Sequence, residues 1–342
     1  MGAEIAEPEK RNWDALIKVI NSANNFVLSS HLDPDADALG SELAFARYLK
    51  AIGKKVTILH ASPIRENIQF LIHENEVNNC EAHDQLLHDA FSKADVLFAF
   101  DIGDFTRLGI IGEAALSYKI PMYSIDHHHG NKLEFTDQIN DPTASSTGFL
   151  VYELIKTMDP DYLMPLEIAE PLYVAVMSDT GNFRFNNADA KSFRMAADCI
   201  ESGINPNEYY VKIYDDLNTV GRIKLMKILF NEMILTDDKK LAYVILDKDT
   251  FAEQGIEKGD TQGISDYLRS FKGVEIGCSF LLSRTENIDV SMRSKGHIKV
   301  NTLANKYNGG GHYFAAGCQI PKEKPEMIDA LIKELIDLVK DY

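Results

Sequence analysis

The stretch Ser124-Ile125-Asp126-His127-His128-His129-Gly130-Asn131 is the most informative in the chain. A run typical of a β-strand, residues 120–125, ends here in one acid and three imidazoles, and Gly130 then opens a loop. Neutral histidine suits Mn, Fe, Co or Zn, and carboxylate suits hard divalent ions. Side chains alternate along a strand, so at most two of these histidines can serve one site. Taken alone, the stretch fits a surface loop as well as a metal site.

The size and composition of the chain are those of a globular protein with two domains. It has 342 residues, more than one hydrophobic core usually serves. Its formal net charge of −17 argues against sustained binding to long nucleic acid, which requires a broad basic surface. The net charge does not exclude small anionic substrates, because clustered acids can hold cations and the cations can hold phosphate.

Neither a membrane span nor a secretory signal is expected. No apolar run is long enough to cross a bilayer, and residues 1–11 are polar and acidic. The cysteines Cys80, Cys199, Cys278 and Cys318 are scattered and form no CxxC pair. This pattern argues against a disulfide framework and a thiolate zinc site, so we expect a cytoplasmic protein.

An acidic loop follows the first predicted strand, residues 25–30. It reads His31-Leu32-Asp33-Pro34-Asp35-Ala36-Asp37 and precedes a helix predicted over residues 41–52. Open α/β sheets place their sites at the carboxyl ends of strands. An Asp-rich helix N-terminus with Asp37 as its cap would explain one or two of these acids, but not His31. The loop is therefore a candidate metal site.

Other buried elements of this half also end in an acid. A predicted strand over residues 94–101 ends in Asp101, and an apolar segment over residues 167–177, which we expect to be a helix, leads to Asp179. Strand–helix alternation predicts a doubly wound, mostly parallel sheet. Three strand ends carrying acid or histidine favour the metal hypothesis over coincidence. Arg107, in the loop after Asp101, is expected to form a structural ion pair.

The second half is expected to hold a helical connector and a smaller α/β domain. The predicted boundaries are 12–195 for the first domain, 196–232 for the connector and 233–342 for the second domain. The second domain contains Asn308-Gly309-Gly310-Gly311-His312. Glycines let backbone amides approach a ligand and form an anion-binding nest, above all before a helix. A flexible linker is the alternative, but the aromatic residues Tyr313 and Phe314 argue against it.

These motifs together resemble the DHH phosphoesterase superfamily with a DHHA1 domain, in particular its NrnA-type nanoRNases and pAp phosphatases. The resemblance covers essentially the whole chain after the first dozen residues. It rests on His31-x-x-x-Asp35-x-Asp37, Asp101, Asp126-His127-His128, Asp179 and Gly309-Gly310-Gly311-His312. One such motif would be weak evidence, whereas the four DHH motifs in the family's order are specific.

The resemblance implies two divalent metal ions, usually Mn²⁺. Six side chains would hold them: His31 and Asp35 the first, Asp37, His127 and Asp179 the second, and Asp101 both. His128 would act with Asp101 in catalysis by facing the substrate phosphate, and Asp126 would accept a hydrogen bond from a histidine and fix its tautomer. Asp33 and His129 receive no ligand role.

The resemblance also implies the substrate-binding residues of the second domain. Arg293 and the glycine motif, Gly309, Gly310, Gly311 and His312, would bind a phosphate or a ribose. Lys295 is expected to be a solvated loop lysine.

The implied activity is hydrolysis of short oligoribonucleotides, of the 3′-phosphate of adenosine 3′,5′-bisphosphate (pAp), or of both. Two metals would activate the attacking hydroxide. An alternative in the same family is a phosphodiesterase for cyclic-di-AMP or its linear product pApA. A nucleotide-binding module without catalysis is disfavoured because all six ligands are present. The expected partner is short RNA or a small phosphorylated nucleotide. Binding to long duplex nucleic acid or to a membrane is not expected, and the chain could form a homodimer.

Overall fold

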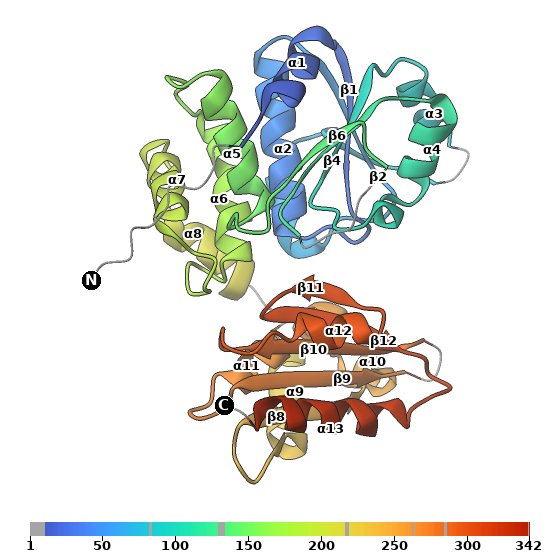
Figure 1. The fold of residues 1–342 in the computed structure, drawn as a ribbon, viewed down its shortest axis with the longest axis vertical. Coiled ribbons are helices and arrows are strands. Elements are labelled where there is room, and N and C mark those ends of the chain that lie inside the picture. The colour runs from blue at the N-terminus through green and yellow to red at the C-terminus, as the bar shows by residue number, and fades with distance from the viewer. Residues whose placement is uncertain are drawn as a thin grey trace. The chain divides into compact units, whose positions relative to one another are not determined.

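The computed structural model describes residues 11–81, 84–128, 134–215, 219–261, 263–283, 286–340 and 342. The chain divides into two compact units, with the boundary between Ile213 and Tyr214. Figure 1 shows the elements of both units. The boundary falls inside the segment predicted as a connector, and the two connector limits stay predictions. Among the described residues, no helix combines the length and the apolar character needed to cross a membrane.

The first unit is built on a six-stranded sheet with the order β3-β2-β1-β4-β5-β6. Every pairing in it is parallel, which confirms the predicted doubly wound α/β class. The strands are β1 (Asn25–Ser30), β2 (Lys55–His60), β3 (Val77–Asn79), β4 (Val96–Phe100), β5 (Met122–Asp126) and β6 (Asp137–Asn140). The strand order reverses between β1 and β4, and such a switch point is where ligands bind in open α/β sheets.

Helix α2 (Ala36–Ala51) occupies the centre of the first unit. It packs against β1 and against the helices α5 (Thr147–Met158) and α6 (Leu166–Asp179), so its residues 36–49 are all buried. Gly40 allows this close packing, because a Cβ there would lie 2.4 Å from the carbonyl oxygen of Pro171 in α6. The amino end of α2 is thereby held at the switch point of the sheet.

The remaining helices of the first unit complete its layers. They are α1 (Asp14–Ser22), α3 (Gln85–Phe91), α4 (Ile110–Tyr118), α7 (Ala190–Glu201) and α8 (Pro206–Tyr210). α3 and α4 cover one sheet face, where Phe91 and Ile111 pack in one buried cluster with Val27 and Leu97. Residues 66–71 form a 3₁₀ helix, η1 (Glu66–Leu71).

The second unit is a mixed α/β domain with the strand order β11-β12-β10-β9-β8-β7. Its strands are β7 (Ile234–Leu235), β8 (Leu241–Asp247), β9 (Ile276–Leu282), β10 (Ile288–Ser294), β11 (Gly310–His312) and β12 (Ala315–Ile320). Its helices are α9 (Thr219–Glu232), α10 (Phe251–Gln254), α11 (Ile264–Arg269), α12 (Asn301–Lys306) and α13 (Met327–Val339). Residues alternate along β8, so Leu241 faces the cluster that contains α13, whereas Ala242 faces the cluster that contains α9 and α11.

Candidate metal centre and substrate residues

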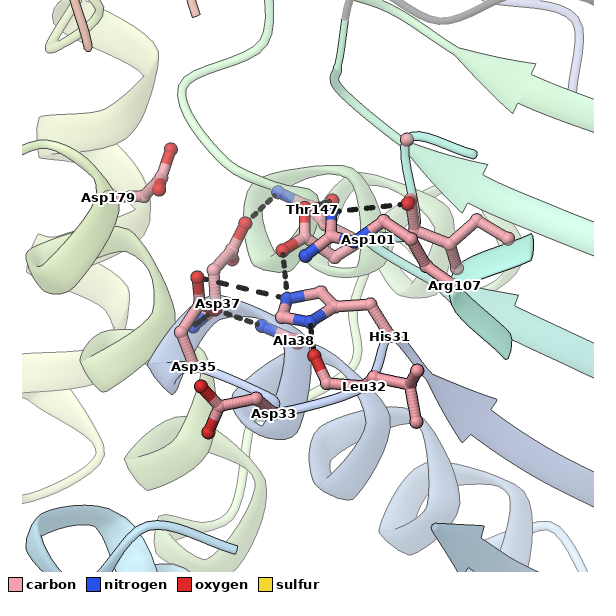
Figure 2. Close-up of polar contacts among 12 residues, drawn as sticks. His31, Leu32, Asp33, Asp35, Asp37, Ala38, Asp101, Arg107, Thr147 and Asp179 are labelled. Atoms are coloured by element: carbon pink, nitrogen blue, oxygen red, sulfur yellow. Dashed lines mark hydrogen bonds and ion pairs between the residues drawn. The ribbon is translucent and has the colours of Figure 1, made fainter. Parts of the chain in front are cut away.

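The six predicted ligands lie together at the carboxyl edge of the sheet of the first unit. His31, Asp35 and Asp101 form one group, and Asp37, His127 and Asp179 form another, with the ligand atoms of each group within 4.8 Å of one another. Figure 2 shows His31, Asp35, Asp37 and Asp101 converging, with Asp179 contributed by the end of α6. The sequence-predicted set is thus brought together in two groups of three, and its role in metal binding stays a prediction.

His31 points one ring nitrogen at carboxylates. Its Nδ1 lies 2.7 Å from the carbonyl oxygen of Leu32, which can only accept, so Nδ1 carries the proton. The other nitrogen, Nε2, lies 3.7 Å from Asp101 Oδ2 and 3.9 Å from Asp35 Oδ2. In a neutral ring this atom presents a lone pair to two carboxylates, and a cation between them makes that arrangement favourable.

His127 is arranged in the same way in the second group. Its Nδ1 lies 3.2 Å from the carbonyl oxygen of Ala144, and its Nε2 lies 3.3 Å from Asp179 Oδ2 and 3.5 Å from Asp37 Oδ2. Ligand atoms about 2.1 Å from one ion are themselves roughly 3–3.4 Å apart in octahedral or tetrahedral geometry. The spacing around His127 Nε2 therefore fits a shared cation.

Asp101 lies between the two groups. Its Oδ2 is the oxygen near His31, whereas its Oδ1 lies 3.6 Å from His127 Nε2. It follows the last residue of β4 and has a left-handed backbone, with φ of 56°. Burial raises the pKa of Asp101, but the imidazoles of His128, His127 and His31 outweigh burial and hold that pKa well below its usual range. Asp101 is therefore an ionised carboxylate with one oxygen toward each group.

The other buried acids of the cluster repel one another when no cation is between them. Burial, followed by the charges of Asp101, Asp179 and Asp35, raises the pKa of Asp37 well above its usual range. Burial is also the main cause that raises the pKa of Asp179 to about 6. Divalent cations would relieve this crowding, and imidazole nitrogen with carboxylate oxygen is a suitable donor set for them. The residues present therefore fit two divalent ions.

Asp35 lies in the first ligand group and also caps helix α2. Its Oδ1 caps α2 by accepting hydrogen bonds from the amides of Asp37 and Ala38, over 3.0 and 3.1 Å. Asp37 is thus inside the first turn, and the alternative that made Asp37 the cap is wrong. α2 begins at Ala36, earlier than the predicted residue 41, because this cap is already in place.

Thr147 is a functional residue that the sequence reasoning missed. Its hydroxyl donates to Asp101 Oδ1 over 2.9 Å, and its amide donates to Asp37 Oδ2 over 2.7 Å (Figure 2). The amide of Gly148 donates to Asp37 Oδ1 over 2.9 Å. The amino end of α5 therefore orients carboxylates of both groups. The available signal was Gly148, because glycine in a helix is unfavourable without a packing reason.

Asp126 and His128 form a separate hydrogen-bonded pair. His128 Nδ1 lies 2.9 Å from Asp126 Oδ1, and Asp126 Oδ2 accepts from the amide of Gly103 over 2.7 Å. Burial lowers the pKa of His128, but the charges of Asp101 and Asp126 and their hydrogen bonds raise it well above its ordinary value. Asp126 accepts from a histidine, as predicted. His129 lies outside the described residues.

Two other charged residues near the cluster, Asp33 and Arg107, differ in whether they form an ion pair. Both carboxylate oxygens of Asp33 accept from Arg65, over 2.9 and 3.1 Å, so Asp33 is outside both ligand groups. Arg107 donates to the carbonyl oxygen of Ile102 over 3.3 Å. It forms no ion pair within 4.0 Å with any residue that the structure describes, so the predicted structural ion pair is not formed there, although the charge of Arg107 lowers the pKa of Asp104.

The predicted substrate residues of the second unit share one row of its sheet. Arg293 in β10 and His312 in β11 both pair with Ala315 of β12, so they lie on the same face with a small side chain between them. Arg293 Nε lies 3.3 Å from Asp266 Oδ2. Lys295 donates to the carbonyl oxygen of Phe271 over 2.8 Å and is partly buried, so the expectation of a solvated lysine is wrong.

The glycine motif does not form the predicted loop before a helix. Its residues 310–312 are the edge strand β11 and pair with β12. A Cβ on Gly309 would lie 2.1 Å from the carbonyl oxygen of Gly317, and one on Gly311 would lie 2.6 Å from that of Ala315. These two glycines are required by backbone packing, whereas Gly310 has open space at its Cβ position.

Comparisons with known proteins agree with this geometry. The model of the DHH family, N-terminal domain, matches residues 25–176, and that of the DHHA1 domain matches residues 238–341. The bifunctional oligoribonuclease and PAP phosphatase NrnA of Thermus thermophilus is 27% identical over 338 residues, covering 98% of this chain and 96% of the relative. The NrnA of Bacillus subtilis is 26% identical over 329 residues, covering 96% of this chain and 98% of the relative.

A solved structure supports the same relationship. The exopolyphosphatase-related protein from Bacteroides fragilis superposes with a TM-score of 0.85 at 26% identity, covering 96% of this chain and 97% of that chain. The two matched domains together span most of the chain, in the order expected from its motifs. The chain therefore belongs to the DHH phosphoesterase family and carries a DHHA1 domain in its second half.

Proposed function

We propose that this protein is a Mn²⁺-dependent phosphoesterase that hydrolyses short oligoribonucleotides and the 3′-phosphate of pAp. The observation that carries the proposal is Asp101, whose two oxygens face two imidazole–carboxylate groups. Paired metal sites of this kind serve in-line displacement at phosphorus. The NrnA relatives support this substrate class, because they match the chain over nearly its whole length.

In this proposal each group of ligands holds one divalent ion. His31 and Asp35 would hold the first, Asp37, His127 and Asp179 would hold the second, and Asp101, with one oxygen toward each group, would serve both. Two such ions supply Lewis-acid activation of water and of the phosphoryl group. Their charge also balances the carboxylates, so that an anionic substrate can enter an otherwise acidic site.

Other predicted residues, in the first unit and in the second, act on the substrate. His128 is held through Nδ1 by Asp126, so its Nε2 can donate a hydrogen bond to the phosphate and a proton to the leaving oxygen. Arg293 and His312 bind a second phosphate or a ribose, because a guanidinium and an imidazole on one sheet face are suited to anions. The free, buried cysteines suit the reducing cytoplasm in which we propose that the protein acts.

A turnover panel tests the proposal. Protein loaded with Mn²⁺, Mg²⁺ or Zn²⁺ is incubated with pAp, pApA, cyclic-di-AMP and RNAs of two to five nucleotides. We expect fastest turnover of the shortest RNAs and pAp with Mn²⁺, loss of activity in EDTA, and recovery when Mn²⁺ is restored. A protein that binds two ions but turns over none of these substrates would contradict the proposal, and preference for cyclic-di-AMP would favour the alternative phosphodiesterase.

The acidic loop offers a matched pair of variants for the same assay. Asp33→Asn and Asp35→Asn remove the same charge two residues apart, but only Asp35 lies in a ligand group. We expect Asp35→Asn to lower turnover at least a hundredfold and Asp33→Asn to change it only a few-fold. Equal effects of the two substitutions would contradict the ligand assignment.

A further inference from the structure

Gly103 marks a small space beside Asp101 that the side chains of His128 and Arg107 flank. A Cβ built on Gly103 would lie 3.5 Å from Cγ of His128 and 3.7 Å from Nη1 of Arg107. The imidazole and the guanidinium therefore line the same space. The backbone of Arg107 is also tied to the acidic loop, because its carbonyl oxygen accepts from the amide of Leu32 over 2.8 Å (Figure 2).

The guanidinium of Arg107 forms no ion pair within 4.0 Å in the described part of the chain, although its charge lowers the pKa of Asp104. Three other arginines of the first unit, Arg11, Arg47 and Arg65, pair with carboxylates. Arg107 has no carboxylate within 4.0 Å among the described residues, and the hydrogen bond from its side chain to the carbonyl oxygen of Ile102 is long, at 3.3 Å.

The nearest candidate partner of Arg107 in sequence is Asp104, and the two interact through charge without an ion pair within 4.0 Å. The carboxylate of Asp104 accepts from the amide of Thr106 over 2.8 Å at the start of the 3₁₀ helix η2 (Phe105–Leu108). In a chain with 52 acids against 35 bases, a partly buried arginine beside His128 that has no described carboxylate within 4.0 Å points to an anion from outside. Guanidinium groups bind phosphate oxygens through paired N–H donors.

We propose that Arg107 is a further catalytic residue, which contacts the same substrate phosphate as His128. The proposal rests on the proposed function and deepens it by assigning a second side chain to the scissile phosphate. Arg107 supplies permanent charge from the side of Gly103, whereas His128 supplies the proton for the leaving oxygen. The ligand class is a phosphate monoester or diester, and the contact is independent of which nucleoside it carries.

Binding of AMP and adenosine to the Mn²⁺-loaded protein tests this without requiring turnover. The variants are Arg107→Met, which removes the charge at similar length, Arg107→Lys, which retains it, and the control Arg194→Met on the exposed face of α7. We expect Arg107→Met to weaken AMP binding about tenfold to a hundredfold, as loss of a charged hydrogen bond does, and to leave adenosine binding unchanged. Arg107→Lys should recover part of the affinity, and Arg194→Met should match the wild type.

Kinetics and metal content distinguish a contact between Arg107 and the substrate phosphate from a role of Arg107 in holding the fold or the metal ligands. Two bound ions and the melting temperature should be unchanged in Arg107→Met, and added guanidinium ion should restore part of the turnover of Arg107→Ala. Equal AMP affinity in wild type and Arg107→Met, or a loss that follows loss of metal, would overturn the proposal. Failure of the proposed function would show instead as a wild-type protein that is inactive on the whole nucleotide panel.

Discussion

The hydroxyl of Thr147 donates a hydrogen bond to Asp101 Oδ1 over 2.9 Å, and the Thr147 side chain has no exposed surface. Because the amide of the same residue donates to Asp37, one residue holds a carboxylate of each ligand group. Hydrogen bonds of this kind orient ligands and are part of a metal site as much as the ligands are.

Replacing Thr147 tests this relationship. Thr147→Val removes the hydroxyl at constant shape, and Thr147→Ser retains it. We expect Thr147→Val to weaken Mn²⁺ binding about tenfold, the lower end of what loss of such a partner costs, and Thr147→Ser to stay near the wild type. Isothermal titration calorimetry measures the affinity, and the melting temperature in EDTA checks that both variants fold. Equal Mn²⁺ affinity in the two variants would show that the hydroxyl does not position Asp101.

Removing the metal should destabilise the first unit. Ions that bind only the folded protein at a hundred times their Kd contribute about 2.7 kcal/mol of stability, which corresponds to roughly 5–10 °C in a domain of this size. We therefore expect EDTA to lower the melting temperature by that amount and Mn²⁺ to restore it. In Asp101→Asn the response to EDTA should shrink, because Asp101 is the residue that we propose as a ligand of both ions. A wild-type melting curve unaffected by chelation would contradict the presence of a metal centre.

Much of this site could be predicted because its residues follow long apolar runs. β1 and β4 are buried along nearly their whole length, so their carboxyl ends, and with them His31 and Asp101, were evident. β3 and β6 were missed because both are short and polar at the ends of the sheet. Thr147 was missed for a different reason, since its hydrogen bonds join segments 46 and 110 residues apart in the chain.

A buried ion pair makes the stability of the first unit depend on acid pH. Arg47 and Glu76 are both buried and are joined by hydrogen bonds of 2.7 and 2.9 Å. Burial raises the pKa of Glu76, but the hydrogen bonds from Arg47 and from the amide of His73 outweigh it, so that pKa is lowered overall. A lowered pKa in the folded state means that this stability is present above the unfolded pKa of about 4.3 and is lost as the pH falls through the folded value.

Glu76→Gln should remove this pH dependence. We expect the variant to be less stable by about 1–3 kcal/mol at pH 7, since it loses charged hydrogen bonds, and the difference from the wild type to narrow below pH 4. Urea unfolding between pH 7 and pH 3 measures both quantities. Glu81→Gln, at an exposed position of the same unit, is the control and should follow the wild type. If the difference in unfolding free energy between Glu76→Gln and the wild type were constant with pH, the Arg47–Glu76 pair would not be the cause of the pH dependence.

The glycine motif of the second unit makes separate predictions for its three glycines. Its strand pairing with β12 joins residues that no local pattern relates, which is why a loop was expected in place of β11. Gly309→Ala and Gly311→Ala place a methyl group within 2.1 and 2.6 Å of carbonyl oxygens of β12, and Gly311 also has a φ of 127°.

Those two substitutions should each destabilise the second unit by more than about 2 kcal/mol, because they combine backbone overlap with, at Gly311, an unfavourable φ. Gly310→Ala meets open space at an ordinary φ, so its unfolding free energy should stay within about 0.5 kcal/mol of the wild type. Chemical denaturation monitored in the second unit measures the unfolding free energy of all three variants. If Gly310→Ala is as stable as the wild type, any change in its AMP affinity reflects contact between the ligand and the motif and not a loss of folding. If Gly310→Ala is destabilised as much as the other two variants, the motif requires glycine for backbone conformational freedom and not for packing against β12.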